Sequence, residues 1–349
     1  MSRPLTDRES DILRAIVYDY ISTGKPVGSR SFVQKYSFAI SPATMRNIMF
    51  DLESLGYLVQ PHTSSGRVPT DKGYRFYVDM LLDSYDFESA KKTRTREIFK
   101  DDLIRREFHL DKMFLSVSKM LSIASRYAGV VLTPLPDFTV VKHIELINLD
   151  NNEILFILVT RTGMIFTKKV IISSNITKNE LFVCSNYLTS ELCGYSLSEI
   201  KGSIFDKLRG QRGIRSNDEI ALDITELALS RNEEPDLFID GIENLLHIQE
   251  MVETERLNSL LHIIEEKSKL KSIMEKNLDF EGVITLIGEE INEVDITGCS
   301  IVTSAYKIGS KNVGVVAILG PTRMDYEKVV PLVDYAGRMV SDLLTNISE

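Results

Sequence analysis

Arg46 and Asn47 carry hydrogen-bonding side chains that would lie on the same face of a helix, and small residues precede them. Ser41 and Ala43 precede them by about one turn, and Thr44 lies at the edge of the same face. In a major groove, arginine and asparagine match the edges of guanine and adenine, and small residues let the start of a helix enter. The pattern therefore predicts a recognition helix for double-stranded DNA, with all five residues as contacts.

Local signals at both ends favour a helix from Pro42 to Leu55. Ser41 is a good N-cap, proline costs no hydrogen bond at the first helical position, and Gly56 accepts the left-handed backbone that ends a helix. The predicted apolar stripe consists of Met45, Ile48, Leu52 and Leu55. The opposite face, with Arg46 and Asn47, also carries Phe50.

The neighbouring segments supply the remaining parts of a winged helix-turn-helix over residues 1–82. Thr6 with Glu9 forms a capping box at the start of a first helix, and Ser29 is the expected cap of a short second helix. After the recognition helix come a strand, a polar hairpin and a further helix. The predicted ranges are 6–23 for the first helix, 30–36 for the second, 57–60 for the strand, 61–69 for the hairpin and 70–82 for the last helix.

The hairpin has the composition of a DNA-contacting wing. Its serines and glycine allow close backbone approach, and His62 and Arg67 are predicted at its tip, where Arg67 supplies a cation to the minor groove. Ser65 in the hairpin, with Arg30 and Lys72 on its flanks, completes the predicted contacts. Winged helices also serve as protein-interaction modules, so this pattern alone leaves both functions open.

The charge of the chain is unevenly distributed. Residues 1–78 hold ten Lys or Arg and seven Asp or Glu, a net charge of +3, whereas the whole chain carries −9. The remainder therefore carries −12. A basic segment on an acidic body localises affinity for a polyanion to that segment, and DNA repels the acidic body. The charge distribution therefore favours DNA binding by the N-terminal segment alone.

Four longer segments of the chain match one family. They are Pro26–Arg30, Ser41–Asn47, Gln60–Tyr74 and Gly320–Tyr326. All four resemble the bacterial HrcA family of heat-inducible transcription repressors. The resemblance implies a homodimeric repressor that binds an inverted-repeat operator upstream of chaperone operons and loses activity on heat stress, with chaperonin as a further partner. It also implies a winged helix, a GAF-like domain and an inserted dimerisation domain.

Hydrophobic periodicity divides the rest of the chain into two β-rich blocks and a mainly helical middle. Strands are predicted over 127–133, 139–148, 154–160, 164–171, 282–287, 296–307 and 313–319. Helices are predicted over 94–126, 178–192, 219–228, 238–246, 250–276 and 325–344, with a loose region at 202–213. The expected fold class is therefore α+β and multi-domain, with one α/β domain interrupted by an insertion.

Together with the resemblance, these blocks give the expected domain limits. Residues 1–82 form the winged helix-turn-helix, 83–172 a linker helix and the first part of the GAF-like domain, 173–235 the inserted dimerisation domain, and 236–349 the second part of the GAF-like domain.

The sequence offers no catalytic or metal-binding constellation. Its three cysteines and five histidines are scattered, and none of the common nucleophile, zinc or nucleotide-binding motifs occurs. No cofactor and no enzymatic activity are therefore expected. The longest apolar runs, 154–159 and 313–319, are too short to span a bilayer, and the N-terminus lacks the apolar stretch of a signal peptide. The expected location is cytoplasmic, with no membrane partner.

A second class of function uses the same DNA-binding segment. In a ligand-sensing transcriptional regulator, the GAF-like domain binds a metabolite in a pocket with convergent polar groups. Arg323 and Asp325, in the loop 320–326, are the candidates for such groups, and they are expected instead to cap the last helix and pair locally. The sensor is therefore the alternative to the stress-responsive repressor.

Overall fold

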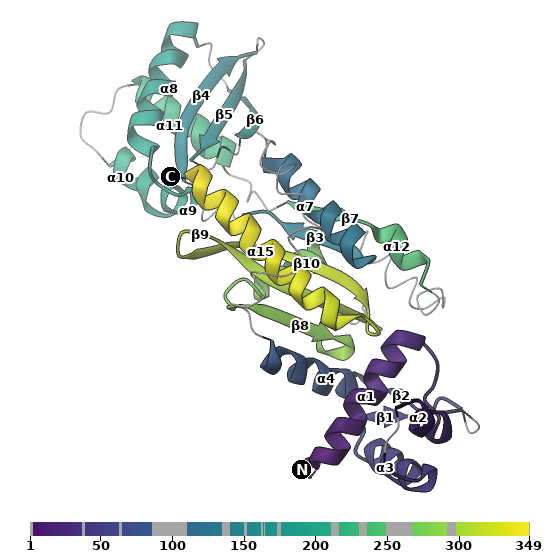
Figure 1. The fold of residues 1–349 in the computed structure, drawn as a ribbon. Coiled ribbons are helices and arrows are strands. Elements are labelled where there is room, and N and C mark those ends of the chain that lie inside the picture. Colours follow the sequence, from purple (N-terminus) through teal and green to yellow (C-terminus); the bar gives the residue numbers. More distant parts are fainter. Residues whose placement is uncertain are drawn as a thin grey trace.

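The computed structural model of the protein describes residues 3–36, 39–62, 65–85, 110–134, 140–149, 152–161, 163, 165–172, 176–210, 216–229, 236–248, 267–291 and 298–348. The N-terminal helices lie at one end of an elongated molecule, a five-stranded sheet lies in the middle, and a three-stranded sheet lies at the other end (Figure 1). The predicted linker beyond residue 85 lies outside the described residues, as do 94–109 and 250–266 of two predicted helices. None of the described helices is both long and apolar enough to cross a membrane.

The N-terminal unit, which we call the head, follows the predicted order of elements. It consists of α1 (Asp7–Thr23), α2 (Ser29–Tyr36), α3 (Pro42–Ser54), β1 (Leu58–Val59), β2 (Val68–Pro69) and α4 (Asp71–Ser84). The two strands pair antiparallel, with Val59 opposite Val68. Two details differ from the prediction: each strand is only two residues long, and Ser29 belongs to α2 instead of capping it.

The start of α1 shows how local contacts stabilise the head. Thr6 accepts a hydrogen bond from the Glu9 backbone (3.3 Å), and the Glu9 carboxylate accepts one from the Thr6 backbone (2.9 Å), which confirms the predicted capping box. Hydrogen bonds from Arg3 are the largest cause that lowers the pKa of Glu9 to about 2. The stabilisation from this carboxylate is therefore present above its ordinary pKa of 4.5 and is lost as pH falls towards about 2.

A five-stranded antiparallel sheet forms the centre of the molecule. Its strands are β3 (Ala128–Leu132), β7 (Leu237–Asp240), β8 (Val283–Ile287), β9 (Cys299–Ile308) and β10 (Lys311–Pro321), in the order β7-β3-β10-β9-β8. Its two faces are covered by helices: α7 (Leu110–Ser125) and α15 (Tyr326–Ser348) on one, α12 (Ile242–Leu246) and α14 (Lys267–Lys276) on the other. Neighbouring residues of β10 alternate between these layers, since Ile318 lies in the core with α15 and Ala317 in the core with α14.

The strand β7 occupies the start of a predicted helix. The prediction over 238–246 is wrong for its first part, because β7 is a strand and only α12 is helical. Phe238 pairs with Val131, so β7 supplies the backbone of β3 with a second hydrogen-bonded neighbour. Gly241, with a φ of +79°, then turns the chain into α12. Strand pairing between distant segments overrides the local helical pattern here.

The three-stranded sheet and its helices, which we call the distal unit, share a core of their own. The unit consists of β4 (Val141–Asn148), β5 (Glu153–Thr160), β6 (Ile165–Ile171), α8 (Lys178–Leu192), α9 (Leu197–Glu199), η3 (Ile200–Ile204), α10 (Phe205–Arg209) and α11 (Ser216–Leu229). Phe156 and Leu158 of β5 lie in one buried cluster with Leu188 of α8. This core extends across residue 173, the predicted start of the inserted domain, since the strands before it and the helices after it share the same buried cluster.

The region that the sequence predicts to be loose, 202–213, is helical up to Arg209. Ile204, Phe205 and Leu208 are buried in the core of the distal unit. Burying three large apolar side chains outweighs the glycines and charges that give this segment its irregular appearance in the sequence.

Candidate nucleic-acid interface

The predicted recognition helix, α3, turns one face inward and leaves the other exposed. Its fully buried residues are Met45, Met49 and Leu52. Its exposed residues include Ala43, Thr44, Arg46 and Asn47. The buried stripe is centred on Met49, whereas Ile48 and Leu55, which are predicted members of the stripe, are only partly buried at its edges.

Caps at both ends hold α3 in place. The Ser41 hydroxyl accepts a hydrogen bond from the Thr44 backbone (3.1 Å) and contacts the Thr44 hydroxyl (2.9 Å). At the other end Gly56 has a φ of +81°, and Tyr57 donates its backbone N–H to the Leu52 carbonyl (2.9 Å). Both predicted caps are confirmed, so a helix that is fixed at each end carries the exposed face.

The hairpin between β1 and β2 is closed by Ser65. Its hydroxyl accepts a hydrogen bond from the His62 backbone (3.0 Å) and donates one to the His62 carbonyl (2.7 Å). The Gln60 side chain donates to the Ser65 carbonyl (3.0 Å). Ser65 therefore shapes the turn from within, while His62 is exposed.

Arg67 lies at the base of the hairpin, so its predicted place at the tip is wrong. Its backbone pairs with Val27 through two hydrogen bonds of 2.9 and 3.0 Å. Its guanidinium binds the Glu53 carboxylate of α3 at 2.8 and 2.9 Å, and its side chain is only 14% exposed. Arg67 therefore braces the hairpin against α3.

The two flanking cations lie at different places. Arg30 is exposed in the first turn of α2, which packs against α3. Lys72, in the first turn of α4, donates to the Leu55 carbonyl at the C-terminal end of α3 (2.8 Å) and lies 4.3 Å from the centre of the Tyr57 ring. At 1.5 Å per residue α3 is about 20 Å long, so nearly its whole length separates Lys72 from Ser41. The structure groups the predicted contacts of α3 together and leaves Lys72 apart from them.

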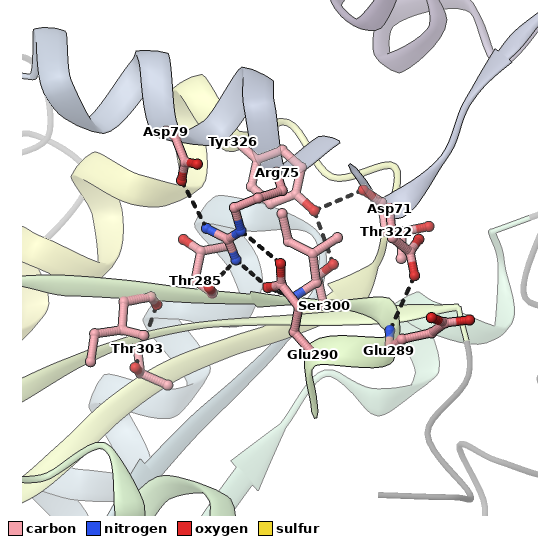
Figure 2. A network of polar contacts seen from close by, with 12 residues as sticks. Asp71, Arg75, Asp79, Thr285, Glu289, Glu290, Ser300, Thr303, Thr322 and Tyr326 are labelled. Carbon is pink, nitrogen blue, oxygen red and sulfur yellow. Dashed lines mark hydrogen bonds and ion pairs between the residues drawn. The ribbon is translucent and has the colours of Figure 1, made fainter. Parts of the chain in front are cut away.

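A polar network around Arg75 joins α4 to the central sheet (Figure 2). The guanidinium binds both carboxylate oxygens of Glu290, with 2.8 Å from Nε to Oε1, and donates to the Thr285 carbonyl of β8 (2.5 Å). It also contacts the Asp79 carboxylate one turn along α4 (3.2 Å). A bidentate carboxylate partner holds an arginine in one orientation. These contacts therefore fix α4 against the edge strand of the sheet.

Two further contacts attach the head to the rest of the molecule. Asp71 accepts a hydrogen bond from the Glu289 backbone (3.1 Å), and a Cβ on neighbouring Gly288 would lie only 1.8 Å from its carboxylate. Arg323 donates to the Ile21 carbonyl in α1 (2.7 Å). The partner in this hydrogen bond lies 302 positions away along the chain, whereas the sequence predicts that Arg323 pairs locally.

Comparison with a solved structure supports the fold. A crystal structure of a hypothetical protein, 24% identical in sequence, aligns over 99% of this chain and 100% of that chain with a TM-score of 0.64. The two proteins therefore share their fold along the whole chain.

Comparison with families and curated relatives confirms the resemblance seen in the sequence. Residues 111–330 match the family model for the HrcA protein C terminal domain. The heat-inducible transcription repressor HrcA of Geobacter sulfurreducens is 37% identical over 343 residues, which cover 97% of this chain and 98% of that protein. The HrcA repressor of Leptospira biflexa serovar Patoc is 35% identical over 346 residues, 99% of each protein. The chain belongs to the HrcA family of heat-inducible transcription repressors.

Proposed function

We propose that this protein represses transcription by binding operator DNA through the exposed face of α3. The observation that carries the proposal is that α3 buries its methionines and leaves Arg46 and Asn47 exposed, next to small Ala43. In this proposal the head is a winged helix-turn-helix with β1 and β2 as its wing, and the five-stranded sheet with its helices is the GAF-like domain.

The residues of α3 contact different parts of the DNA in this proposal. Arg46 donates to guanine and Asn47 pairs with adenine in the major groove. Ser41, Ala43 and Thr44 lie at the N-terminal end of the helix, where the positive end of the helix dipole attracts phosphate. Small side chains there let the helix enter deeply enough for the two longer ones to reach base edges.

The hairpin and the flanking cations contact the DNA backbone in this proposal. His62 and Ser65 lie on the hairpin that approaches the minor groove beside the recognition helix. Arg30 and Lys72 are exposed cations that bind phosphates, which position a protein on the duplex without reading its sequence.

Selection from a pool of random duplexes by the full-length protein tests this function. We expect the pool to converge on one sequence, called the enriched duplex below. The protein should bind it about 10³-fold or more tightly than random DNA at physiological salt, as specific binders do. A protein that retains DNA without enriching any sequence would refute operator recognition.

Arg67 acts in this proposal as a positioning residue for the wing. We expect Arg67→Ala and Glu53→Gln to weaken binding of the enriched duplex to a similar extent, about fivefold, because either change removes the ion pair between the hairpin and α3. The loss should be the same with A·T-rich and G·C-rich flanks in a fluorescence anisotropy titration. A loss confined to Arg67→Ala and larger beside A·T-rich flanks would instead assign Arg67 to the minor groove, as its sequence context predicts.

The distal unit carries an exposed apolar sheet face. On β5, Leu155, Ile157 and Val159 alternate with buried residues and are partly exposed. On the neighbouring strand β6, Ile165 and Ile171 are 59% and 73% exposed. The buried residues of these strands lie with α8 and α11 on the other face. Thr167 and Lys169 lie between these two isoleucines on β6, so the face is mixed, and exposed aliphatic side chains gathered in this way are typical of a protein interface.

A second copy of the chain is the proposed occupant of this face. A two-fold axis brings the same patch of both copies together, and the patch is self-complementary in charge, since Lys169 and Glu153 lie on it 3.8 Å apart. The proposed homodimer interface therefore lies on β5 and β6. The sequence places it in 173–235, on the helices that share the core with those strands.

Heat control in this proposal needs only a repressor of low stability and chaperonin as the partner that refolds it. Apparent operator affinity falls in proportion to the competent fraction of the protein. After mild heating, we expect chaperonin with ATP to raise the fraction of protein that titrates the enriched duplex, without changing the Kd of the active protein. Full activity after refolding alone, with release of DNA by a metabolite, would favour the sensor alternative.

A further inference from the structure

The exposed face of α3 carries a large apolar side chain, that of Phe50, which is 60% exposed. By contrast, Phe32 of α2 is buried in the core of the head. Full burial of a phenylalanine contributes about 1.5–3 kcal/mol to stability, so the head forgoes a gain by keeping this ring in water. Single exposed apolar residues are common on proteins, and it is the position of this one that suggests a function.

Phe50 lies in the middle of the recognition face. At 3.6 residues per turn it is about 40° from Arg46 and about 60° from Asn47 around the helix axis, on the turn that follows them. The helix is intact at this point, and the Ser54 hydroxyl donates to the Phe50 carbonyl (2.9 Å). A duplex that receives Arg46 and Asn47 therefore also meets the ring of Phe50.

We infer that Phe50 reads thymine by contacting its 5-methyl group in the major groove, an inference that rests on the proposed function. A T·A pair presents an apolar methyl group there, and phenylalanine is one of the side chains that contact it. The ring forms no conventional hydrogen bond, so it adds nothing to the readout of guanine or adenine. Phe50 thus gives α3 a second, apolar kind of base recognition, at one position in each half-site.

Deoxyuridine tests this contact, because it lacks only the 5-methyl group and keeps the base pairing of thymine. Each thymine of the enriched duplex is replaced in turn, and binding is measured by fluorescence anisotropy. We expect one thymine per half-site at which replacement weakens wild-type binding about fourfold, the effect of losing one methyl-sized apolar contact. Phe50→Ala removes this contact in both half-sites, so it should bind the unmodified duplex about 16-fold more weakly, and the same replacement should not weaken its binding further.

Three controls make the experiment decisive. Phe50→Leu keeps an apolar side chain and should retain part of the dependence on the methyl group. Tyr18→Ala removes another exposed aromatic of the head, 45% exposed on α1, and should leave that dependence intact. Unchanged binding of random duplex by Phe50→Ala shows that the head remains folded.

The outcomes separate this inference from the proposed function. Phe50 does not read thymine if replacement by deoxyuridine lowers the affinity of Phe50→Ala as much as that of the wild type. The same conclusion holds if no replacement changes the affinity of the wild type. If the proposed function itself is wrong, the wild type enriches no sequence in the first place.

Discussion

Lysine substitutions at both Ile165 and Ile171 are expected to turn the proposed dimer into monomers and to lower its affinity for the enriched duplex by about 10²–10⁴-fold. Both side chains are more than half exposed on β6, so the substitutions should leave the buried core of the distal unit, and hence its stability, nearly unchanged. Across a two-fold interface each lysine brings like charges together. In a monomer the second head is no longer linked to the first, so its binding to the same duplex no longer benefits from a high effective concentration.

Light scattering measures the mass of this variant, and anisotropy measures its affinity for the whole duplex and for a single half-site. Half-site binding should stay at the wild-type level, because the heads are unchanged. Phe182→Lys is the matched control, since Phe182 is 63% exposed on α8 and lies off the sheet face. It should remain a dimer with full affinity. If the variant with both lysine substitutions is still a dimer, the interface lies on another surface, and the helices of 173–235 are the next candidate.

Arg46→Ala is expected to cost about 1–3 kcal/mol per half-site on the enriched duplex and to relax specificity at one base pair. The loss on random duplex should be much smaller, because the phosphate contacts remain. Arg8→Ala makes the same change of charge at an exposed position of α1 and should affect both duplexes alike. If Arg46→Ala weakens both duplexes equally, Arg46 contacts phosphate and not a base.

The helices of the head could be predicted because their signals are local. Ser41 and Gly56 act on residues within one turn of themselves, so the chain near them is enough to show where α3 begins and ends. The same holds for α8, whose predicted range of 178–192 agrees with the structure at both ends. A capping box there, from Thr177 to Glu180, also depends only on neighbours in the chain.

Features that depend on distant segments could not be predicted. The partner of Arg67 is Glu53 on α3, 14 positions earlier in the chain, and nothing in the composition of the predicted wing indicates that this cation is already paired. The sequence does not show the distal unit as one unit for the same reason. Runs of β-branched residues predict strands but do not indicate which sheet the strands join. The cluster around Phe156 and Leu188, with the hydrogen bond from the Leu146 backbone to Ser185, shows that β4, β5 and β6 belong with the helices that follow them.

In the proposed function, two copies of α3 read one symmetric operator. Hydroxyl-radical footprinting of the full-length protein on the enriched duplex tests it most directly. We expect two protected stretches related by a dyad, with centres about 34–36 Å apart or a multiple of that distance. A single protected stretch, or two without dyad symmetry, would contradict the account.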